Sequence, residues 1–247
     1  MNAATENLDL PALNQMFETT DPLRIIEWSA AQFGDEMALS SSFGADSAVM
    51  IHLVHRVKPG MRIVWVNTGY LFAETHAYME QLRHRFNLQV WTYRTHNDPI
   101  AYLRAAGEEN PAWRKDITAC CAVNKNEPFE RAMKELSPKA WLRGIRRDQT
   151  MVRADRKILE WSERFHCHAI SPLLNWTGRE IHAYLKKYDL PRHPLWEKGY
   201  VSIGCSPLSC TRAIGEGDDP RSGRWAGQDK VECGINLDKN SLDSANL

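Results

Sequence analysis

Short apolar segments alternate with amphipathic segments along most of the chain. Residues 37–42 (MALSSS), 62–67 (RIVWVN) and 88–93 (LQVWTY) have the length and composition of buried strands. Between them, apolar residues recur at helical spacing over 48–57 and 73–86. Because strands that alternate with helices build parallel sheets covered on both faces, the pattern predicts an α/β fold.

The same alternation continues in the second half of the chain. A helix is predicted over 126–136 and a strand over 140–145. Thr177, followed three residues later by Glu180, has the spacing of a capping box and predicts a helix over 177–188. After residue 214 the sequence is rich in glycine, charge and turn residues. We therefore predict one α/β domain over 1–214 and a mobile C-terminal tail over 215–247.

Three loops follow predicted strands directly. They are FGADS (43–47), NTGY (67–70) and RRDQ (146–149). Ligands of open parallel sheets bind at the carboxyl ends of the strands, so these loops are the first candidates for a binding site.

Charge and composition narrow the classes of function. The chain has 247 residues, 43% of them apolar and 25% charged, and its 31 Lys and Arg equal its 31 Asp and Glu. No overall field draws it to nucleic acid or an anionic membrane, so any anion site must be local. No apolar run approaches the ~20 residues of a membrane span, and the N-terminus lacks a secretory signal pattern. We expect a cytoplasmic protein.

The segment SSSFGADSA (40–48) has features of an anion-binding turn. Small residues and Gly44 let backbone N–H groups approach a ligand, and Ser47 begins a helix whose N-terminus favours negative charge. An ordinary strand-to-helix turn capped by Asp46 or Ser47 is the alternative.

A basic loop follows the strand predicted over 140–145. Five arginines fall within fourteen residues: Arg143, Arg146, Arg147, Arg153 and Arg156. Guanidinium groups bind phosphate or sulfate through paired hydrogen bonds, and the position at a strand end favours that role over a solvated surface.

Four of the six cysteines form two separated pairs, Cys120 with Cys121 and Cys205 with Cys210. Without an export signal, metal ligation or redox chemistry is favoured over disulfides. Two pairs suit a tetrathiolate metal site. Adjacent cysteines fit a single zinc ion poorly, whereas a cubane iron–sulfur cluster offers separate iron corners. Reduced, buried cysteines are the alternative, and Cys167 in an apolar segment is predicted to be one.

Cys233 stands apart in the polar sequence KVECGIN. A nucleophilic thiol must be accessible and deprotonated, but the neighbouring Glu232 would raise its pKa. If Cys233 is a nucleophile, positive charge must come from elsewhere, with Lys125, Arg221 and Arg224 as candidates. The alternative is a surface thiol without a role.

Together these segments resemble the sulfonucleotide reductases, which reduce adenylyl sulfate (APS) or its 3′-phosphorylated form (PAPS) to sulfite. LSSSFGADSAVMIHLV, NTGYLFAET, GIRRDQTMVRA, HPLWEKGYVSIGC and ECGIN are each similar to a motif of that family, and they occur in the family's order. The resemblance implies a Rossmann-like sheet of the adenine nucleotide alpha-hydrolase type.

The resemblance also implies a reaction and its residues. Cys233 would attack the sulfur of the sulfonucleotide to give an S-sulfocysteine, and a separate thioredoxin or glutaredoxin would release sulfite. Homo-oligomer formation is left open. The residues implied to bind substrate are Ser41, Ser42, Phe43, Gly44, Ser47, Asn67, Thr68, Gly69, Lys125, Gly144, Arg146, Arg147, Arg221, Arg224 and Asn236.

In this family a cysteine quartet goes with a 4Fe-4S cluster and usually with APS, so Cys120, Cys121, Cys205 and Cys210 imply a cluster and APS, with PAPS as the alternative. The chain departs from the family at two places. Its second pair has four intervening residues where the family has two, and Asn236 stands where the family has His. We expect Asn236 to alter pH dependence or tail docking rather than to abolish the reaction.

Two other classes of function compete. An ATP-pyrophosphatase-type sulfurtransferase would have a glycine where Phe43 stands, to make room for pyrophosphate. A nucleotide-sensing metalloprotein would not need Cys233.

Overall fold

The computed structural model describes residues 8–96, 117–206, 210–215, 219, 221–226, 230, 232 and 234–236. Its centre is a six-stranded sheet with the order β3-β2-β1-β4-β6-β5. The strands are β1 (Met37–Ser40), β2 (Arg62–Val66), β3 (Gln89–Tyr93), β4 (Ala140–Arg143), β5 (Leu159–Ser162) and β6 (Cys167–Ile170). All neighbouring strands pair in parallel except β5, which is antiparallel to β6. The predicted α/β class is confirmed.

The predicted helices are present with small changes at their ends. They are α3 (Ser47–Val57), α4 (Ala73–Phe86), α8 (Glu127–Leu136) and α10 (Gly178–Lys187). The Thr177 side chain accepts a hydrogen bond from the Glu180 backbone N–H, and the Glu180 side chain accepts one from the Thr177 backbone, so the capping box forms.

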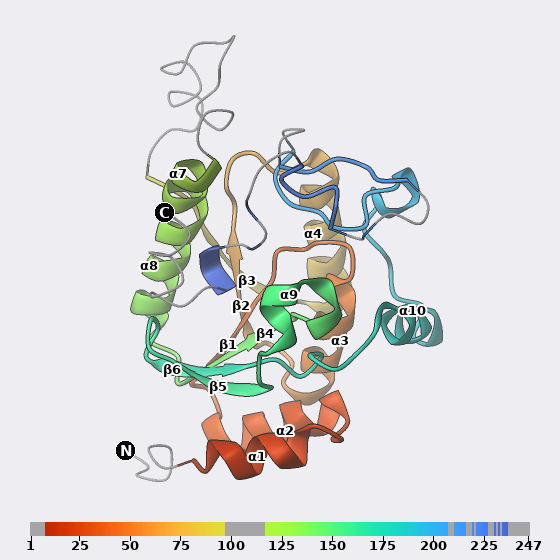
Figure 1. The fold of residues 1–247 in the computed structure, drawn as a ribbon. Coiled ribbons are helices and arrows are strands. Elements are labelled where there is room, and N and C mark those ends of the chain that lie inside the picture. The colour runs from red at the N-terminus through yellow and green to blue at the C-terminus, as the bar shows by residue number, and fades with distance from the viewer. Residues whose placement is uncertain are drawn as a thin grey trace.

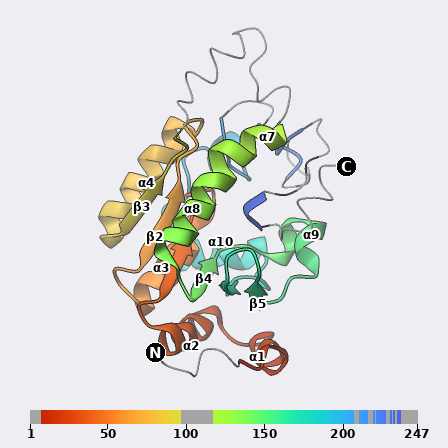
Figure 2. The ribbon, with the colours of Figure 1, turned by 90° about the vertical axis from the view of Figure 1, so that its left-hand side faces the viewer.

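Alternate strand residues face two apolar clusters. Met37 and Leu39 of β1 pack among side chains of the N-terminal helix over Pro22–Phe33 (α2) and of α3, α4 and α10. Ala38 packs against Phe129 and Met133 of α8. Helices therefore cover both faces of the sheet, as a parallel sheet requires. Figures 1 and 2 show α8 on one side of the strands and α3, α4 and α10 on the other.

Two N-terminal helices were not predicted. In α1 (Leu10–Phe17), Asp9 caps the helix by accepting a hydrogen bond from the Ala12 N–H at 3.0 Å. In α2 (Pro22–Phe33), Asp21 accepts from the Leu23 N–H at 2.8 Å. Both helices carry a proline in the first turn. They cover the end of the sheet opposite the loops that follow β1, β2 and β4, as Figure 1 shows.

Several short elements lie near the carboxyl edge of the sheet. They are α7 (Ile117–Cys121), the π-helix η2 (Ala122–Asn126), the 3-10 helices η3 (Arg147–Gln149), η4 (Trp196–Lys198) and η5 (Gly234–Asn236), and the single turn α9 (Met151–Ala154). No helix in the described ranges is long and apolar enough to cross a membrane.

The described residues beyond 214 pack against the sheet domain. Trp225 and Glu232 are almost fully buried, and Arg224 forms an isolated antiparallel bridge with Thr211. The division into a domain over 1–214 and a mobile tail over 215–247 stays a prediction.

His193 ties α4 to the loop before η4. Its Nε2 lies 3.0 Å from Thr75 Oγ1, and its Nδ1 accepts a hydrogen bond from the Leu195 N–H at 3.2 Å. The ring is 1% exposed, and burial lowers its pKa to about 4. The folded protein therefore holds a neutral imidazole that would lose the Leu195 contact on protonation.

This histidine should make stability depend on pH. Its pKa is lower in the folded chain than the ordinary 6.5, so its contribution is present above pH 6.5 and is lost as pH falls toward 4. At 1.4 kcal/mol per unit, the loss is about 3 kcal/mol. We expect urea unfolding to show a larger loss of unfolding free energy for the wild type than for His193→Gln when the pH is lowered from about 7 to about 4. The difference between the two losses should be about 3 kcal/mol. Parallel pH profiles of the two proteins would contradict it.

Candidate active site

The order of strands changes direction between β1 and β4. The chain runs outward from β1 through β2 to β3, and then crosses back to place β4 on the other side of β1. Ser40 at the end of β1 is in register with Arg143 at the end of β4. In open α/β sheets, this topological switch is where a crevice forms and ligands bind.

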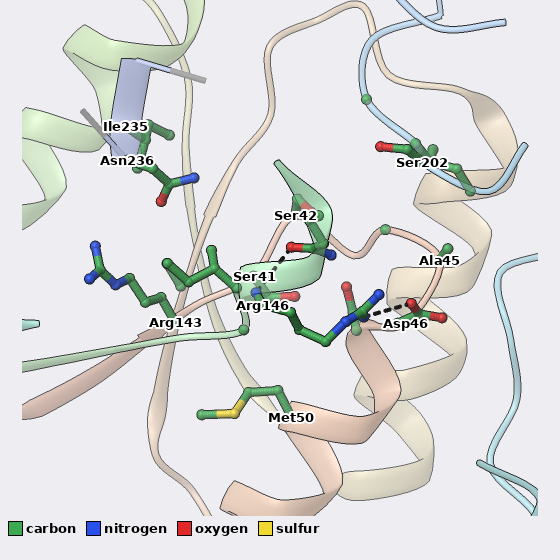
Figure 3. Close-up of a pocket in the computed structure, with 18 of the residues that line it drawn as sticks. Ser41, Ser42, Ala45, Asp46, Met50, Arg143, Arg146, Ser202, Ile235 and Asn236 are labelled. Carbon is green, nitrogen blue, oxygen red and sulfur yellow. Dashed lines mark hydrogen bonds and ion pairs between the residues drawn. The ribbon is translucent and has the colours of Figure 1, made fainter. Parts of the chain in front are cut away.

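A cavity of about 260 Å³ lies at this switch, near the lower end of the roughly 300–1,000 Å³ typical of ligand pockets. Loops after β1, β2 and β4 meet there with residues 201–205 and with parts of the C-terminal segment. The predicted site residues that line it are Ser41, Ser42, Gly44, Ser47, Thr68, Lys125, Gly144, Arg146, Arg221, Arg224 and Asn236. Figure 3 shows Ile235 and Asn236 facing Ser41, Asp46 and Arg146 across the space.

The lining is strongly cationic. Six basic side chains and two carboxylates, Asp46 and Glu232, border the cavity. The basic residues are Lys125, Arg143, Arg146, Arg153, Arg221 and Arg224. The whole chain has no net charge, so this local excess of basic side chains makes the cavity favourable for an anion.

Phe43 shapes the first loop without lining the cavity. Its φ of 48° is in the left-handed region that favours glycine, and its N–H donates to Ser41 Oγ at 3.1 Å. The ring is fully buried and meets Trp65 edge-on, with the centroids 5.7 Å apart. Burial of the ring compensates the backbone strain, so Phe43 holds the loop rather than touching the space above it.

The second loop divides its residues between the cavity and the turn. Thr68 lines the cavity, whereas Asn67 and Gly69 do not. The Asn67 side chain accepts a hydrogen bond from the Gly69 N–H at 3.0 Å, and Gly69 has a φ of 78°. Asn67 and Gly69 thus build the turn that presents Thr68.

The adjacent arginines of the third loop point in different directions. Arg146 lines the cavity and pairs with Asp46 at 3.1 Å, the contact drawn in Figure 3. Arg147 does not line it. Its guanidinium pairs at 2.8 Å with Glu18, the residue directly after α1, and also bonds Asn175. The structure therefore gives Arg147 a role in joining α1 to the loop after β6, away from the cavity.

Glu232 is not the isolated negative charge that its sequence position suggested. It is 3% exposed, and both its oxygens accept from Arg153, at 2.6 and 2.8 Å. Arg221 lies 4.0 Å away. A buried carboxylate in a two-bond pair contributes little net negative field to its neighbours. Cys233 lies outside the described residues.

The four paired cysteines come near one another. Burial is the main cause that raises the pKa of the Cys120 thiol to about 12, and the charges of Cys121, Cys205 and Cys210 add to it. Cys205 Sγ lies 3.3 Å from Thr68 Oγ1, and Cys205 bridges to Leu71, so the second pair adjoins the loop that follows β2. Residues 207–209, between Cys205 and Cys210, are outside the described part of the chain.

Four cysteine thiols are the donor type that an iron–sulfur cluster uses. No three His, Cys, Asp or Glu side chains in the described ranges are arranged to hold one metal ion. A cubane binds its thiolates at separate corners, so they need not converge on one point. The π-helix that follows Cys121 turns Lys125 to the cavity, and such helices are frequent at functional sites.

Some lining residues were not among those predicted. They include the acids Asp46 and Glu232, Gln149, and the apolar Met50, Ile203 and Trp225. Arg143 and Arg153, which the sequence indicated as part of the basic loop, also line the cavity. Nothing in the local sequence signals the inward direction of Met50, Ile203 or Trp225.

Two solved structures share this fold. Phosphoadenylyl-sulfate reductase from Candida auris superposes with a TM-score of 0.68 at 22% identity, covering 79% of this chain and 93% of that one. FMN adenylyltransferase from Candida glabrata gives 0.57 at 17% identity, covering 98% and 84%. The chain thus has the fold of the PAPS reductase and adenine nucleotide alpha-hydrolase class.

Sequence comparison defines the family. The model of the phosphoadenosine phosphosulfate reductase domain matches residues 36–213. The chain is 35% identical over 237 residues to an adenosine 5′-phosphosulfate reductase of Salinibacter ruber, covering 96% of this chain and 92% of that protein. It is also 35% identical over 233 residues to a phosphoadenosine 5′-phosphosulfate reductase of Gloeobacter violaceus, covering 92% of each. The chain belongs to the sulfonucleotide reductase family, as its motifs predicted, and is an enzyme of that family.

Proposed function

We propose that this enzyme reduces APS to sulfite and AMP in sulfate assimilation, toward cysteine biosynthesis. The observation that carries the proposal is the group of six basic side chains around a cavity at the topological switch of a chain without net charge. A nucleotide with a phosphosulfate group supplies both the anion and the adenosine that such a crevice accepts.

The proposed binding mode follows the lining. The phosphosulfate would lie between Lys125, Arg146, Arg221 and Arg224, and adenosine would lie over the strand ends near Ser41, Ser42 and Thr68. Positive charge fixed around the phosphate stabilises it as it leaves, which lowers the barrier to attack on sulfur.

The reaction would proceed in two steps. The Cys233 thiolate attacks the sulfur of APS, a sulfur–sulfur bond forms, the bond from sulfur to the phosphate oxygen breaks, and AMP leaves. A thiolate of thioredoxin or glutaredoxin then attacks Cys233 Sγ, and sulfite departs with the electron pair of the sulfur–sulfur bond. The second redoxin thiol resolves the mixed disulfide, so the redoxin dithiol is oxidised by two electrons and the sulfate sulfur is reduced by two.

Cys120, Cys121, Cys205 and Cys210 would hold a 4Fe-4S cluster. When bound, it would have a structural or electrostatic role rather than carry electrons, because the proposed electron path runs through thiols. Lys125 would connect the cluster to the substrate site, since it follows Cys120 and Cys121 on η2 and lines the cavity.

The quartet also favours APS over PAPS, and the Salinibacter ruber relative is named for APS. PAPS reduction, with adenosine 3′,5′-bisphosphate as product, is the second candidate, because the Gloeobacter violaceus relative is named for PAPS at the same identity.

Anaerobic purification, a count of iron and sulfide, and sulfite release from APS and PAPS with thioredoxin would test the proposal. We expect iron and sulfide in equal amounts and a preference for APS. An iron-free protein that prefers PAPS would overturn the assignment to APS, and absence of sulfite from both substrates would overturn sulfonucleotide reduction.

Gly204 gives a local test of the cationic lining. A Cβ at this position would overlap the Arg224 guanidinium, whereas one at Gly178 meets nothing within 4 Å. We expect Gly204→Ala to displace Arg224 and lower kcat/KM on the order of 10-fold or more, with Gly178→Ala unchanged. Steady-state kinetics with the wild-type thermal midpoint as a folding check would measure this. Equal kcat/KM values for the two variants would show that Arg224 does not contribute to catalysis at the cavity.

A further inference from the structure

Three arginines from a short stretch of the chain hold the C-terminal segment 232–236. Arg153 pairs with the Glu232 carboxylate at 2.6 and 2.8 Å. Arg156 Nη2 donates to the backbone carbonyl of Asn236 at 2.6 Å. Arg164 Nη1 donates to the backbone carbonyl of Gly234. The chain is therefore held on both sides of position 233.

Arg164 is itself fixed before it reaches the segment. Its Nε and Nη2 donate to Glu130 Oε1 of α8 at 3.0 and 2.6 Å, and its guanidinium lies 5.0 Å from the centroid of the Phe165 ring. The side chain is 3% exposed. The guanidinium fork is planar, so fixing two nitrogens also fixes the direction in which the third donates.

The opposite side of the segment is closed by α8 and the π-helix. A Cβ on Gly234 would overlap the Asn126 side chain, and Ile235 packs against the apolar cluster that contains Phe129 and Trp141. The 3-10 turn η5 thus lies between a packed surface and the arginines, next to the cavity lined by Asn236. Figure 1 shows η5 beside α8.

We propose that Arg156 and Arg164 are positioning residues that fix η5, and with it the reach of Cys233, while Arg153 neutralises Glu232. A neutral donor could also satisfy a backbone carbonyl. Charged donors make stronger hydrogen bonds and add a positive field that favours a thiolate in the segment they hold. The role in catalysis rests on the proposed function, whereas the effect on the thiol does not.

The test uses the full-length holoenzyme and the variants Arg164→Gln, Arg164→Lys and Arg156→Gln. Arg131→Gln is a matched control, because Arg131 also pairs with a glutamate of α8 (Glu127, 3.0 Å), lies over a ring (Tyr93, 5.6 Å) and donates to a backbone carbonyl, that of Arg94. Its contacts are of the same kind and do not include the C-terminal segment.

Two readouts separate positioning from folding. The pH dependence of iodoacetamide alkylation of Cys233 reports the pKa of its thiol, and the tryptic peptide 231–239 contains no other cysteine. The rate of S-sulfonation at saturating APS in the absence of redoxin reports the attack step.

We expect Arg164→Gln and Arg156→Gln to raise the pKa of Cys233 and to slow S-sulfonation about 10- to 100-fold, with KM for APS changed less than about threefold. Arg164→Lys should restore part of the rate, and Arg131→Gln should match wild type. If Arg164→Gln fails to fold, Arg156→Gln carries the test.

Variants with the wild-type alkylation profile and S-sulfonation rate would overturn the inference. A wild-type enzyme that forms no S-sulfocysteine would instead overturn the proposed function, and the alkylation profiles would still decide whether the arginines act on Cys233.

Discussion

Replacing Cys233 by Ser should abolish sulfite release while nucleotide binding is retained. A serine hydroxyl is not deprotonated near neutral pH and cannot form the sulfur–sulfur bond that the proposed intermediate needs, so we expect a loss on the order of 10³-fold or more. Binding should persist because the basic lining belongs to other residues. Sulfite assays and calorimetry with AMP measure the two quantities.

The same variant separates the competing classes of function. Cys121→Ser is not a suitable control, because Cys121 belongs to the quartet. Cys167→Ala is a suitable control, because Cys167 is buried in β6 away from the cavity lining. Full sulfite release by Cys233→Ser would exclude the thiol mechanism. A protein that binds nucleotide but releases no sulfite in any form, wild type included, would favour a nucleotide sensor.

Replacing Cys205 by Ser should remove iron and sulfide from the purified protein. Four thiolates hold a cubane, and loss of one leaves an iron corner without its ligand. We also expect sulfite release to fall on the order of 10²-fold, because Cys205 lines the cavity and contacts Thr68 in the loop that follows β2. Iron and sulfide assays on anaerobically purified protein, followed by kinetics, measure both effects.

Cys167→Ala is again the matched control for Cys205→Ser. Burial raises the pKa of the Cys167 thiol to about 12, and the charged neighbour that acts on it is Arg143 rather than another cysteine. Iron content should be unchanged in Cys167→Ala. Iron retained in full by Cys205→Ser would show that the cluster is not held by this quartet.

Much of the fold could be predicted because its signals are local. The strand-to-helix alternation around 37–93 and the Thr177 to Glu180 spacing each depend on residues a few positions apart. The N-terminal helices were missed although Asp9 and Asp21, each closely followed by a proline, are local start signals. Strand β5 has only four residues and antiparallel pairing to β6, so it lacked a signal of comparable strength.

The candidate site was less predictable than the fold. Lys125 and Asn236 could be named from the sequence, and both line the cavity. Arg147 was named with Arg146, but it faces Glu18, a partner 129 residues away along the chain. Phe43 was named with its loop, but it packs inward against Trp65.

The sequence by itself determined the α/β class, the family and the loops that reach the carboxyl edge of the sheet, because these follow from periodicity and from motifs in order. The tertiary structure decided which of two adjacent arginines faces the cavity and how the charge of Glu232 is neutralised. Such outcomes depend on side-chain direction and on ion-pair partners that are distant in the chain, and Glu232 meets Arg153 across 79 residues. No local sequence pattern predicts such contacts between distant residues.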